Sequence, residues 1–176
     1  MSKKETGISS ILINEKELEN RVRELAKQIS DDYRNNETPP CLIALLKGSF
    51  VFMADLCRYI DIAVEIDFMS VSSYGNDKVG AEVKILKDVD VSLAGKDVII
   101  VEDIIDSGFT LEKICELFRT RDLSSLKICT LLNKPSRRKV DIKVDYNGFD
   151  IEDLFIVGYG IDYAEKYRNL PYIAVV

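Results

Sequence analysis

Three carboxylates and a group of small residues lie close together in residues 98–111, which read VIIVEDIIDSGFTL. The apolar run 98–101 predicts a buried strand that ends in Glu102 and Asp103, and Asp106 then opens a short loop that leads into a predicted helix. Backbone N–H groups at a helix N-terminus attract anions through their geometry and through the helix dipole. Carboxylates beside such a site would repel a phosphate unless ribose hydroxyls or Mg²⁺ lie between them. The pattern therefore predicts a phosphate site with hydroxyls or a metal ion next to it.

Helix capping is a simpler explanation for part of this pattern. Asp106 or Ser107 as the N-cap would satisfy backbone N–H groups of the predicted helix, but capping does not account for the adjacent Glu102 and Asp103. The chain also lacks the glycine-rich phosphate loop of nucleoside triphosphatases and the three-glycine fingerprint of dinucleotide-binding folds.

The composition excludes several kinds of site. The chain has 176 residues, which suits one domain, and a net charge of -6, which disfavours binding to nucleic acid. It contains no histidine, so Ser-His-Asp triads, Cys–His dyads and histidine-containing zinc sites are excluded. The four cysteines form no C-x-x-C pair and lie in apolar stretches, which predicts buried reduced thiols. The polar N-terminus and the lack of a long apolar run predict a cytoplasmic protein that does not bind a membrane.

Alternating strand and helix patterns predict an α/β fold. Apolar residues spaced three and four apart predict a helix over residues 15–30, with Asn14 as its N-cap. Apolar runs predict strands at 41–46, 98–101, 127–132 and 155–157, and helical spacing follows the first two runs, from Phe50 and from Leu111. Strands that alternate with helices form parallel sheets, which bind ligands beyond the carboxyl ends of the strands. Residues 65–74 and 81–86 predict a hairpin between the two strand–helix units, and an ordinary surface hairpin is its structural alternative.

Several segments together resemble one protein family. Residues 98–111 resemble the phosphoribosyl-pyrophosphate motif of type I phosphoribosyltransferases, and further segments resemble the hypoxanthine-guanine branch of that family. These segments are the pyrophosphate loop at 46–49 (LKGS), the lid tip at Ser73 and Tyr74, the strand end at 132–134 (LNK), and the base-binding signature at 155–163 and 167–171 (FIVGYGIDY and YRNLP). The resemblance implies a single domain over residues 1–176, with a parallel sheet and helices on both of its faces. It also implies a small hood built from the N-terminal and C-terminal segments, and a mobile hairpin lid at about residues 70–90.

The resemblance also implies an activity in purine salvage. Members of this branch transfer the phosphoribosyl group from phosphoribosyl pyrophosphate to a 6-oxopurine, so hypoxanthine and guanine are the expected substrates, and IMP or GMP and pyrophosphate the products. The expected cofactor is Mg²⁺, which Mn²⁺ can replace, and the expected assembly is a homodimer or homotetramer. Two rival functions stay open, a phosphoribosyltransferase-like regulator that binds RNA and a sister enzyme that prefers xanthine. A dinucleotide-binding module is disfavoured because the glycine fingerprint is missing.

By resemblance, the functional residues of the family map onto this sequence position by position. Asp106 is the expected general base beside purine N7. The ribose hydroxyls and the 5′-phosphate are assigned to Glu102, Asp103, Asp106, Ser107, Gly108, Phe109 and Thr110. Pyrophosphate is assigned to Lys47, Gly48 and Arg168, and the family places a cis peptide bond between Leu46 and Lys47. The purine is assigned to Lys134, Phe155, Ile156, Val157 and Asp162, and the metal to Glu102, Asp103 and Asp162.

Five of these residues have a purely structural alternative. In that alternative Lys47 is a solvated loop residue, Arg168 is a surface cation paired with Glu165, Lys134 caps a strand, Phe155 packs in the core, and Asp162 shapes a turn.

The sequence departs from the family at two positions. Phe109 stands where some members carry lysine or leucine, but a phenylalanine keeps the backbone N–H that phosphate needs. Glu152 stands where proline is common, which leaves the fine base preference open.

Overall fold

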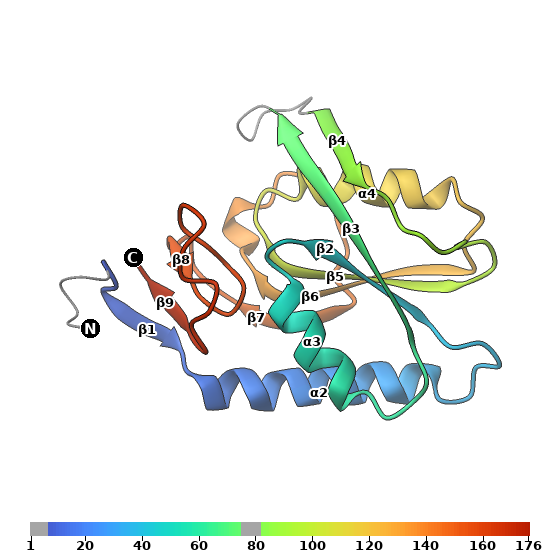
Figure 1. Ribbon diagram of the computed structural model, residues 1–176, viewed down its shortest axis with the longest axis horizontal. Coiled ribbons are helices and arrows are strands. Elements are labelled where there is room, and N and C mark those ends of the chain that lie inside the picture. The colour runs from blue at the N-terminus through green and yellow to red at the C-terminus, as the bar shows by residue number, and fades with distance from the viewer. Residues whose placement is uncertain (1–6, 75–81) are drawn as a thin grey trace.

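The computed structural model describes residues 7–74 and 82–176, which fold into two β-sheets and three α-helices (Figure 1). The large sheet has the strand order β4-β3-β2-β5-β6-β7, and the small sheet has the order β1-β9-β8. The strands of the large sheet are β2 (Cys41–Leu46), β3 (Glu65–Tyr74), β4 (Glu82–Lys87), β5 (Asp97–Ile105), β6 (Ser125–Asn133) and β7 (Tyr146–Asp150). The strands of the small sheet are β1 (Ser10–Ile13), β8 (Ile156–Val157) and β9 (Ile173–Val175).

The large sheet is parallel except at the edge formed by β4. Strand β2 pairs in parallel with β3 and β5, and β6 pairs in parallel with β5 and β7. Strand β4 runs antiparallel to β3 and forms a hairpin with it. The register aligns Leu46 with Ser70 and Ile105 with Asn133, so the carboxyl ends of the parallel strands meet at one edge. Open α/β sheets bind their ligands at this edge.

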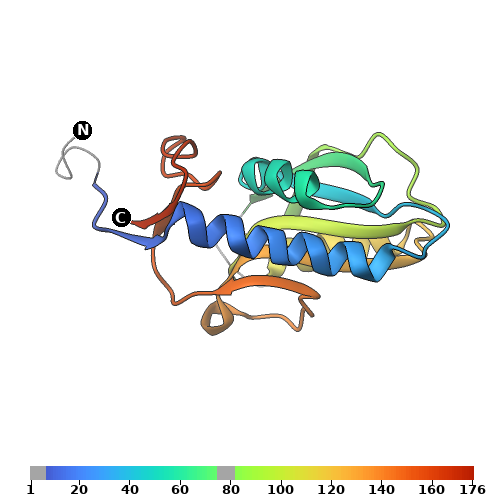
Figure 2. The ribbon, with the colours of Figure 1, turned by 90° about the horizontal axis from the view of Figure 1, so that it is seen from below.

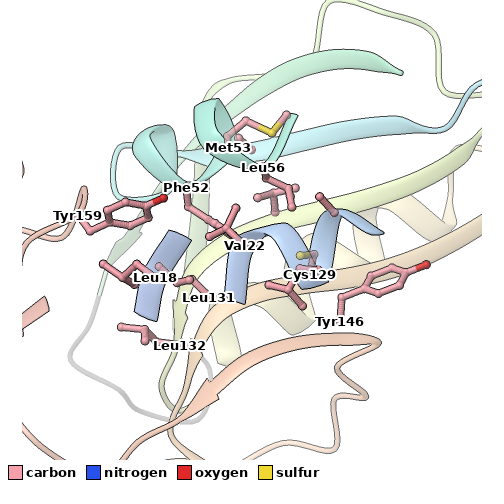
Figure 3. Packing of buried hydrophobic residues seen from close by; sticks show 14 of the residues in the cluster. Leu18, Val22, Phe52, Met53, Leu56, Cys129, Leu131, Leu132, Tyr146 and Tyr159 are labelled. Atoms are coloured by element: carbon pink, nitrogen blue, oxygen red, sulfur yellow. The ribbon is translucent and has the colours of Figure 1, made fainter. Parts of the chain in front are cut away.

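Helices cover both faces of the large sheet, as predicted (Figures 1 and 2). Helices α2 (Glu15–Tyr33) and α3 (Phe50–Tyr59) pack on one face, and α4 (Phe109–Arg119) packs on the other. Successive side chains of a strand point to opposite faces, so each strand contributes to two apolar cores. Figure 3 shows the first core, where Val22 of α2 and Phe52 of α3 pack over Leu131 of β6. The second core joins Ile114 of α4 to Ile100 of β5.

Helix α2 begins where the sequence predicts. The N–H of Glu17 donates to Asn14 Oδ1 at 3.0 Å, and the N–H of Asn14 donates to Glu17 Oε2 at 2.8 Å, which together form a capping box. The predicted apolar stripe is buried, and the helix continues beyond it to Tyr33. There the Lys127 ammonium lies over the Tyr33 ring, which ties the end of α2 to β6.

The structure corrects the sequence-based description of three strands. The strand predicted to stop at Val101 continues as β5 to Ile105 because its pairing with β6 persists, so Glu102 and Asp103 lie within the strand. The predicted strand at 155–157 does not join the parallel sheet, since β8 pairs antiparallel with β9 in the small sheet. The sixth strand of the large sheet is β7, whose sequence YNGFD contains no apolar run.

Both ends of the described chain meet in the small sheet, which lies beside the large sheet (Figure 1). The segment predicted to form a lid includes residues 75–81, which lie outside the described residues. On either side of them β3 and β4 pair, with Ser73 opposite Val83 and Tyr74 opposite Glu82. None of the described helices combines the length and the hydropathy that a membrane span requires.

Candidate active site

The loop predicted to bind phosphate leads from β5 into α4. Gly108 is the N-cap residue of α4, with φ at 89°, and no side chain caps the helix there. The alternative in which Asp106 or Ser107 caps this helix is therefore wrong. A Cβ on Gly108 would lie 2.8 Å from Val140 Cγ2, so both the backbone conformation and the close contact favour glycine. The first N–H groups of a helix have no partner within it, so the start of α4 offers them to an anion.

A row of alternating charges connects Asp106 to Lys134. Asp106 Oδ1 accepts a hydrogen bond from Arg137 Nε at 3.0 Å, and Arg137 Nε lies 3.7 Å from Asp153 Oδ2. Asp153 Oδ1 in turn lies 3.3 Å from Lys134 Nζ. Neither Arg137 nor Asp153 could be recognised from the sequence, although Arg137 follows Lys134 by three residues and a 3₁₀ turn at Pro135–Arg137 connects them.

Lys134 reaches from the end of β6 to the segment that precedes β8. Its ammonium donates to the carbonyl of Leu154 at 2.8 Å, and the residue is only 7% exposed. The next residue, Phe155, is 57% exposed, so the alternative in which it packs in the core is wrong. Its ring meets the ring of Tyr163 edge-on, with the centroids 5.3 Å apart. The other two residues assigned to the purine, Ile156 and Val157, are buried in β8.

The two carboxylates of β5 are poorly solvated. Asp103 is 9% exposed, and the buried Oε2 of Glu102 has no hydrogen-bond partner among the described residues. Burial raises the pKa of Glu102 well above its usual value, and the charge of Asp103 adds to this effect. Burial also raises the pKa of Asp103, although backbone N–H groups and the charge of Arg168 oppose the shift. Neighbouring carboxylates in this state fit a ligand that brings hydroxyl donors or positive charge.

The loop that follows β2 lies directly against Asp103. The peptide bond between Leu46 and Lys47 is cis, as the resemblance implies. A Cβ on Gly48 would lie 1.8 Å from Asp103 Oδ2, and a Cβ on Gly160 would lie 2.1 Å from the carbonyl oxygen of Gly48. Glycine at position 48 therefore leaves room for the Asp103 carboxylate, and glycine at position 160 lets its segment approach the backbone of Gly48 closely.

A pocket of about 320 Å³ opens beside this loop. We call it the pyrophosphate pocket, after the ligand that the resemblance assigns to Lys47, Gly48 and Arg168. Its lining includes Lys47, Gly48, Asp103, Asp162, Glu165 and Arg168. Arg168 NH1 donates to the carbonyl of Gly160 at 2.8 Å, and its NH2 lies 2.7 Å from Asp162 Oδ1. The alternative partner of Arg168, Glu165, lies farther away at 3.5 Å. Asp162 also shapes a turn, as its structural alternative predicts, because its Oδ2 accepts a hydrogen bond from the N–H of Glu165 at 2.8 Å.

The cysteines take no part in this arrangement. All four are free thiols, of which Cys41, Cys115 and Cys129 are buried as predicted, whereas Cys57 is half-buried. Burial raises the pKa of Cys41 and that of Cys115 to about 11. Thiols that stay protonated at neutral pH are poor nucleophiles.

Comparison with known proteins identifies the family. The sequence profile of the phosphoribosyl transferase domain matches residues 9–164. The chain belongs to the phosphoribosyl transferase family. The hypoxanthine-guanine phosphoribosyltransferase of Bacillus subtilis (strain 168) is 55% identical over 170 residues, which are 96% of this chain and 93% of that protein. The hypoxanthine phosphoribosyltransferase of Escherichia coli (strain K12) is 53% identical over 167 residues, which are 94% of each protein. A crystal structure of a hypoxanthine-guanine phosphoribosyltransferase from Bacillus anthracis, 56% identical, matches with a TM-score of 0.92 and covers 96% of this chain and 99% of that one.

In this phosphoribosyl transferase the structure brings some of the predicted site residues together in two groups. One group is the charged row that joins Asp106 to Lys134. The other group surrounds the pyrophosphate pocket and consists of Lys47, Gly48, Asp103, Asp162 and Arg168. The side chains of Ser73 and Tyr74 lie outside the described part of the structure.

The carboxylates of β5 fit the Mg²⁺ expected for a phosphoribosyl transferase. Mg²⁺ takes oxygen ligands and is commonly held by one or two carboxylates together with substrate phosphates. Glu102, with its unpartnered Oε2, and the neighbouring Asp103 offer such oxygens. Residues 7–74 and 82–176 contain no group of three or more His, Cys, Asp or Glu side chains that could hold a metal ion.

Proposed function

We propose that this phosphoribosyl transferase converts hypoxanthine and phosphoribosyl pyrophosphate to IMP and pyrophosphate, and guanine to GMP in the same way. The Bacillus subtilis and Escherichia coli relatives, 55% and 53% identical, are a hypoxanthine-guanine and a hypoxanthine phosphoribosyltransferase, which supports this reaction. The observation that carries the proposal is the position of Lys134. Its buried ammonium lies beside the segment that bears Phe155, and Asp153 and Arg137 connect it to Asp106.

Lys134 and Asp106 suit two polar positions of a 6-oxopurine. An ammonium group only donates hydrogen bonds, so Lys134 can donate to O6 of hypoxanthine or guanine, whereas adenine presents an amino group there. The exposed ring of Phe155 offers a face on which the base can stack. Asp106 accepts the proton of N7, and the hydrogen bond from Arg137 orients its carboxylate.

The reaction is a displacement at the anomeric carbon of the ribose. The bond between purine N9 and C1′ forms while the bond between C1′ and the pyrophosphate oxygen breaks, and the electron pair of that bond leaves with pyrophosphate. The proton of N7 passes to the Asp106 carboxylate. Glu102 and Asp103 hold the ribose hydroxyls, and their negative charge stabilises the positive charge that develops on the sugar.

Cations and backbone N–H groups hold the phosphates. Lys47, Gly48 and Arg168 bind pyrophosphate and stabilise its charge as it leaves. The 5′-phosphate binds at the start of α4, to Ser107, Gly108, Phe109 and Thr110 together with the backbone of Asp106. Mg²⁺, or Mn²⁺ in its place, would bind to Glu102 and Asp103, a second ion would be held through water by Asp162, and the ions would supply further positive charge at the pyrophosphate.

We also propose how the chain is organised, how its site closes and how it assembles. The chain forms one domain, with a hood from its N-terminal and C-terminal segments, and purine contacts from Ile156, Val157 and Asp162. The β3–β4 hairpin, which carries Ser73 and Tyr74, closes over the site because water would otherwise capture the reacting sugar. The protein works in the cytoplasm as a homodimer or homotetramer.

A product assay tests this function. The purified protein is incubated with hypoxanthine, phosphoribosyl pyrophosphate and Mg²⁺, and IMP and pyrophosphate are quantified separately. We expect equal amounts of both products, and none when phosphoribosyl pyrophosphate is omitted. Xanthine as the preferred base would instead identify a xanthine enzyme, and a protein that makes no nucleotide from any purine would contradict the function.

A further inference from the structure

Glu165 occupies the cationic side of the pyrophosphate pocket. Its Oε2 accepts a hydrogen bond from Lys47 Nζ at 3.1 Å and lies 3.5 Å from Arg168 NH2. These are the two cations that the proposed function assigns to pyrophosphate, and the inference rests on that function. We propose that Glu165 is an internal counter-ion of this pocket, which neutralises Lys47 and Arg168 in the free protein and is displaced when pyrophosphate or phosphoribosyl pyrophosphate binds.

The backbone at Glu165 adopts a conformation that its side chain disfavours. Tyr163 and Lys166 exchange two backbone hydrogen bonds of 3.1 Å across a two-residue turn. The central residues, Ala164 and Glu165, have φ values of 50° and 60°, a region in which such turns favour Asn and Gly. Residues other than glycine adopt this region only at an energetic cost, so the backbone of this turn is strained. The bond from the Glu165 N–H to Asp162 Oδ2 stabilises the turn and directs Glu165 into the pocket lining.

The two cations differ in how firmly the protein holds them. The Arg168 side chain is 19% exposed and is anchored by Gly160 and Asp162, so it keeps its place without Glu165. The side chains of Lys47 and Glu165 are each 67% exposed. Exposed ion pairs contribute little stability, because water and salt screen them. The Glu165 carboxylate can therefore leave both cations for solvent at little cost.

Displacement follows from the charges involved. Phosphate oxygens that bind beside Lys47 and Arg168 would meet the Glu165 carboxylate, and like charges repel each other. Glu165 therefore weakens the binding of pyrophosphate and of phosphoribosyl pyrophosphate, and it favours the release of pyrophosphate as a product. A ligand without a pyrophosphate group, such as IMP, does not compete with Glu165.

Titration calorimetry with inorganic pyrophosphate in Mg²⁺ buffer tests this role. Glu165→Gln should lower the Kd of pyrophosphate by about two- to tenfold, the range expected from breaking two weak ion contacts. The gain should shrink as salt concentration rises because the groups are exposed. The Kd of IMP should stay unchanged. Glu116→Gln is the matched control, since it removes the same charge from an exposed pair with Lys113 at 2.8 Å on α4, and it should leave both Kd values unchanged.

The outcomes separate this inference from the proposed function. A damaged site loses affinity, so tighter pyrophosphate binding with unchanged IMP binding is not produced by misfolding. Lys47→Gln serves as the second variant and should weaken pyrophosphate binding. If Lys47→Gln weakens pyrophosphate binding but Glu165→Gln binds pyrophosphate no more tightly than the parent, the counter-ion role is wrong and the proposed function stands. The same conclusion holds if Glu165→Gln tightens the binding of IMP as much as that of pyrophosphate. If Lys47→Gln has no effect, or if the parent protein neither makes IMP nor binds pyrophosphate, the counter-ion role fails together with the assignment on which it rests.

Discussion

Replacing Gly48 with alanine tests the contact between the pyrophosphate loop and β5. The added Cβ would lie 1.8 Å from Asp103 Oδ2, 2.5 Å from its Cγ and 2.9 Å from its Oδ1. Favourable non-bonded contacts between heavy atoms need about 3.5 Å, so the two groups must separate by roughly 1.7 Å. The loop cannot easily move away from Asp103, because the carbonyl oxygen of Gly48 already lies close to Gly160. Most of the displacement therefore falls on the Asp103 carboxylate.

Such a displacement should impair catalysis more than folding. Overpacking typically costs about 1–3 kcal/mol of folding free energy, whereas a misplacement of about 1 Å in an active site can cost about 100-fold in rate. We expect kcat/KM for phosphoribosyl pyrophosphate to fall about 100-fold in Gly48→Ala, measured by initial rates at saturating hypoxanthine, with the folded state checked by thermal unfolding. Gly95→Ala is the control, since nothing lies within 4 Å of its added Cβ, although φ is 72°. It should lose some stability and keep its kcat/KM. A Gly48→Ala protein with the kcat/KM of the parent would refute the role given to Asp103.

Three further perturbations have defined outcomes. Asp106→Asn should lower kcat by about 10- to 1,000-fold, with a smaller change in phosphoribosyl pyrophosphate affinity; unchanged single-turnover rates would remove Asp106 from the chemistry. A chelator should abolish activity without changing the circular dichroism spectrum, and full activity in its presence would contradict the roles of Glu102 and Asp103. Burial alone would raise the pKa of Asp67, but backbone N–H groups, including that of Asp90 at 2.7 Å, hold it below its usual value. Asp67→Asn should therefore cost about 1–3 kcal/mol at neutral pH. A lowered pKa stabilises the fold fully above the unfolded-state pKa of about 4, so in urea unfolding this cost should shrink as the pH falls below about 4 and vanish once the pH is below the folded-state pKa. A cost independent of pH would disprove the explanation.

The large sheet could be predicted where its strands are buried on both faces. Strands β2, β5 and β6 carry continuous apolar runs because each contributes to both cores. Strand β7 could not be found in this way, since contacts with distant residues position it. Arg21 of α2 donates to the carbonyls of Asn147 and Gly148 at 2.6 and 2.8 Å, across more than a hundred residues of sequence.

The candidate site could be predicted where its chemistry is local in the sequence. The carboxylates of β5 and the start of α4 belong to one continuous segment, so their spacing alone indicated a phosphate site. The contact of Arg137 with Asp106 and that of Glu165 with Lys47 could not be recognised, because these partners are remote in sequence. Arg137 contacts Asp106 across 31 residues, and Glu165 contacts Lys47 across 118. The apolar run does not indicate the full length of β5, because only the pairing with β6 shows that the strand continues past Val101.

The central claim is that Lys134 selects 6-oxopurines. It is tested most directly by measuring kcat/KM for hypoxanthine, guanine, xanthine and adenine in the parent protein and in Lys134→Gln. A site that loses a hydrogen bond to a buried charged group can discriminate by about 10⁴-fold, so the parent should use hypoxanthine or guanine and reject adenine. An amide can turn to offer a donor or an acceptor, so Lys134→Gln should lose activity on 6-oxopurines and narrow the gap to adenine, whereas Phe155→Leu should weaken both classes of base alike. Efficient use of adenine by the parent, or an undiminished preference in Lys134→Gln, would show that another group reads position 6.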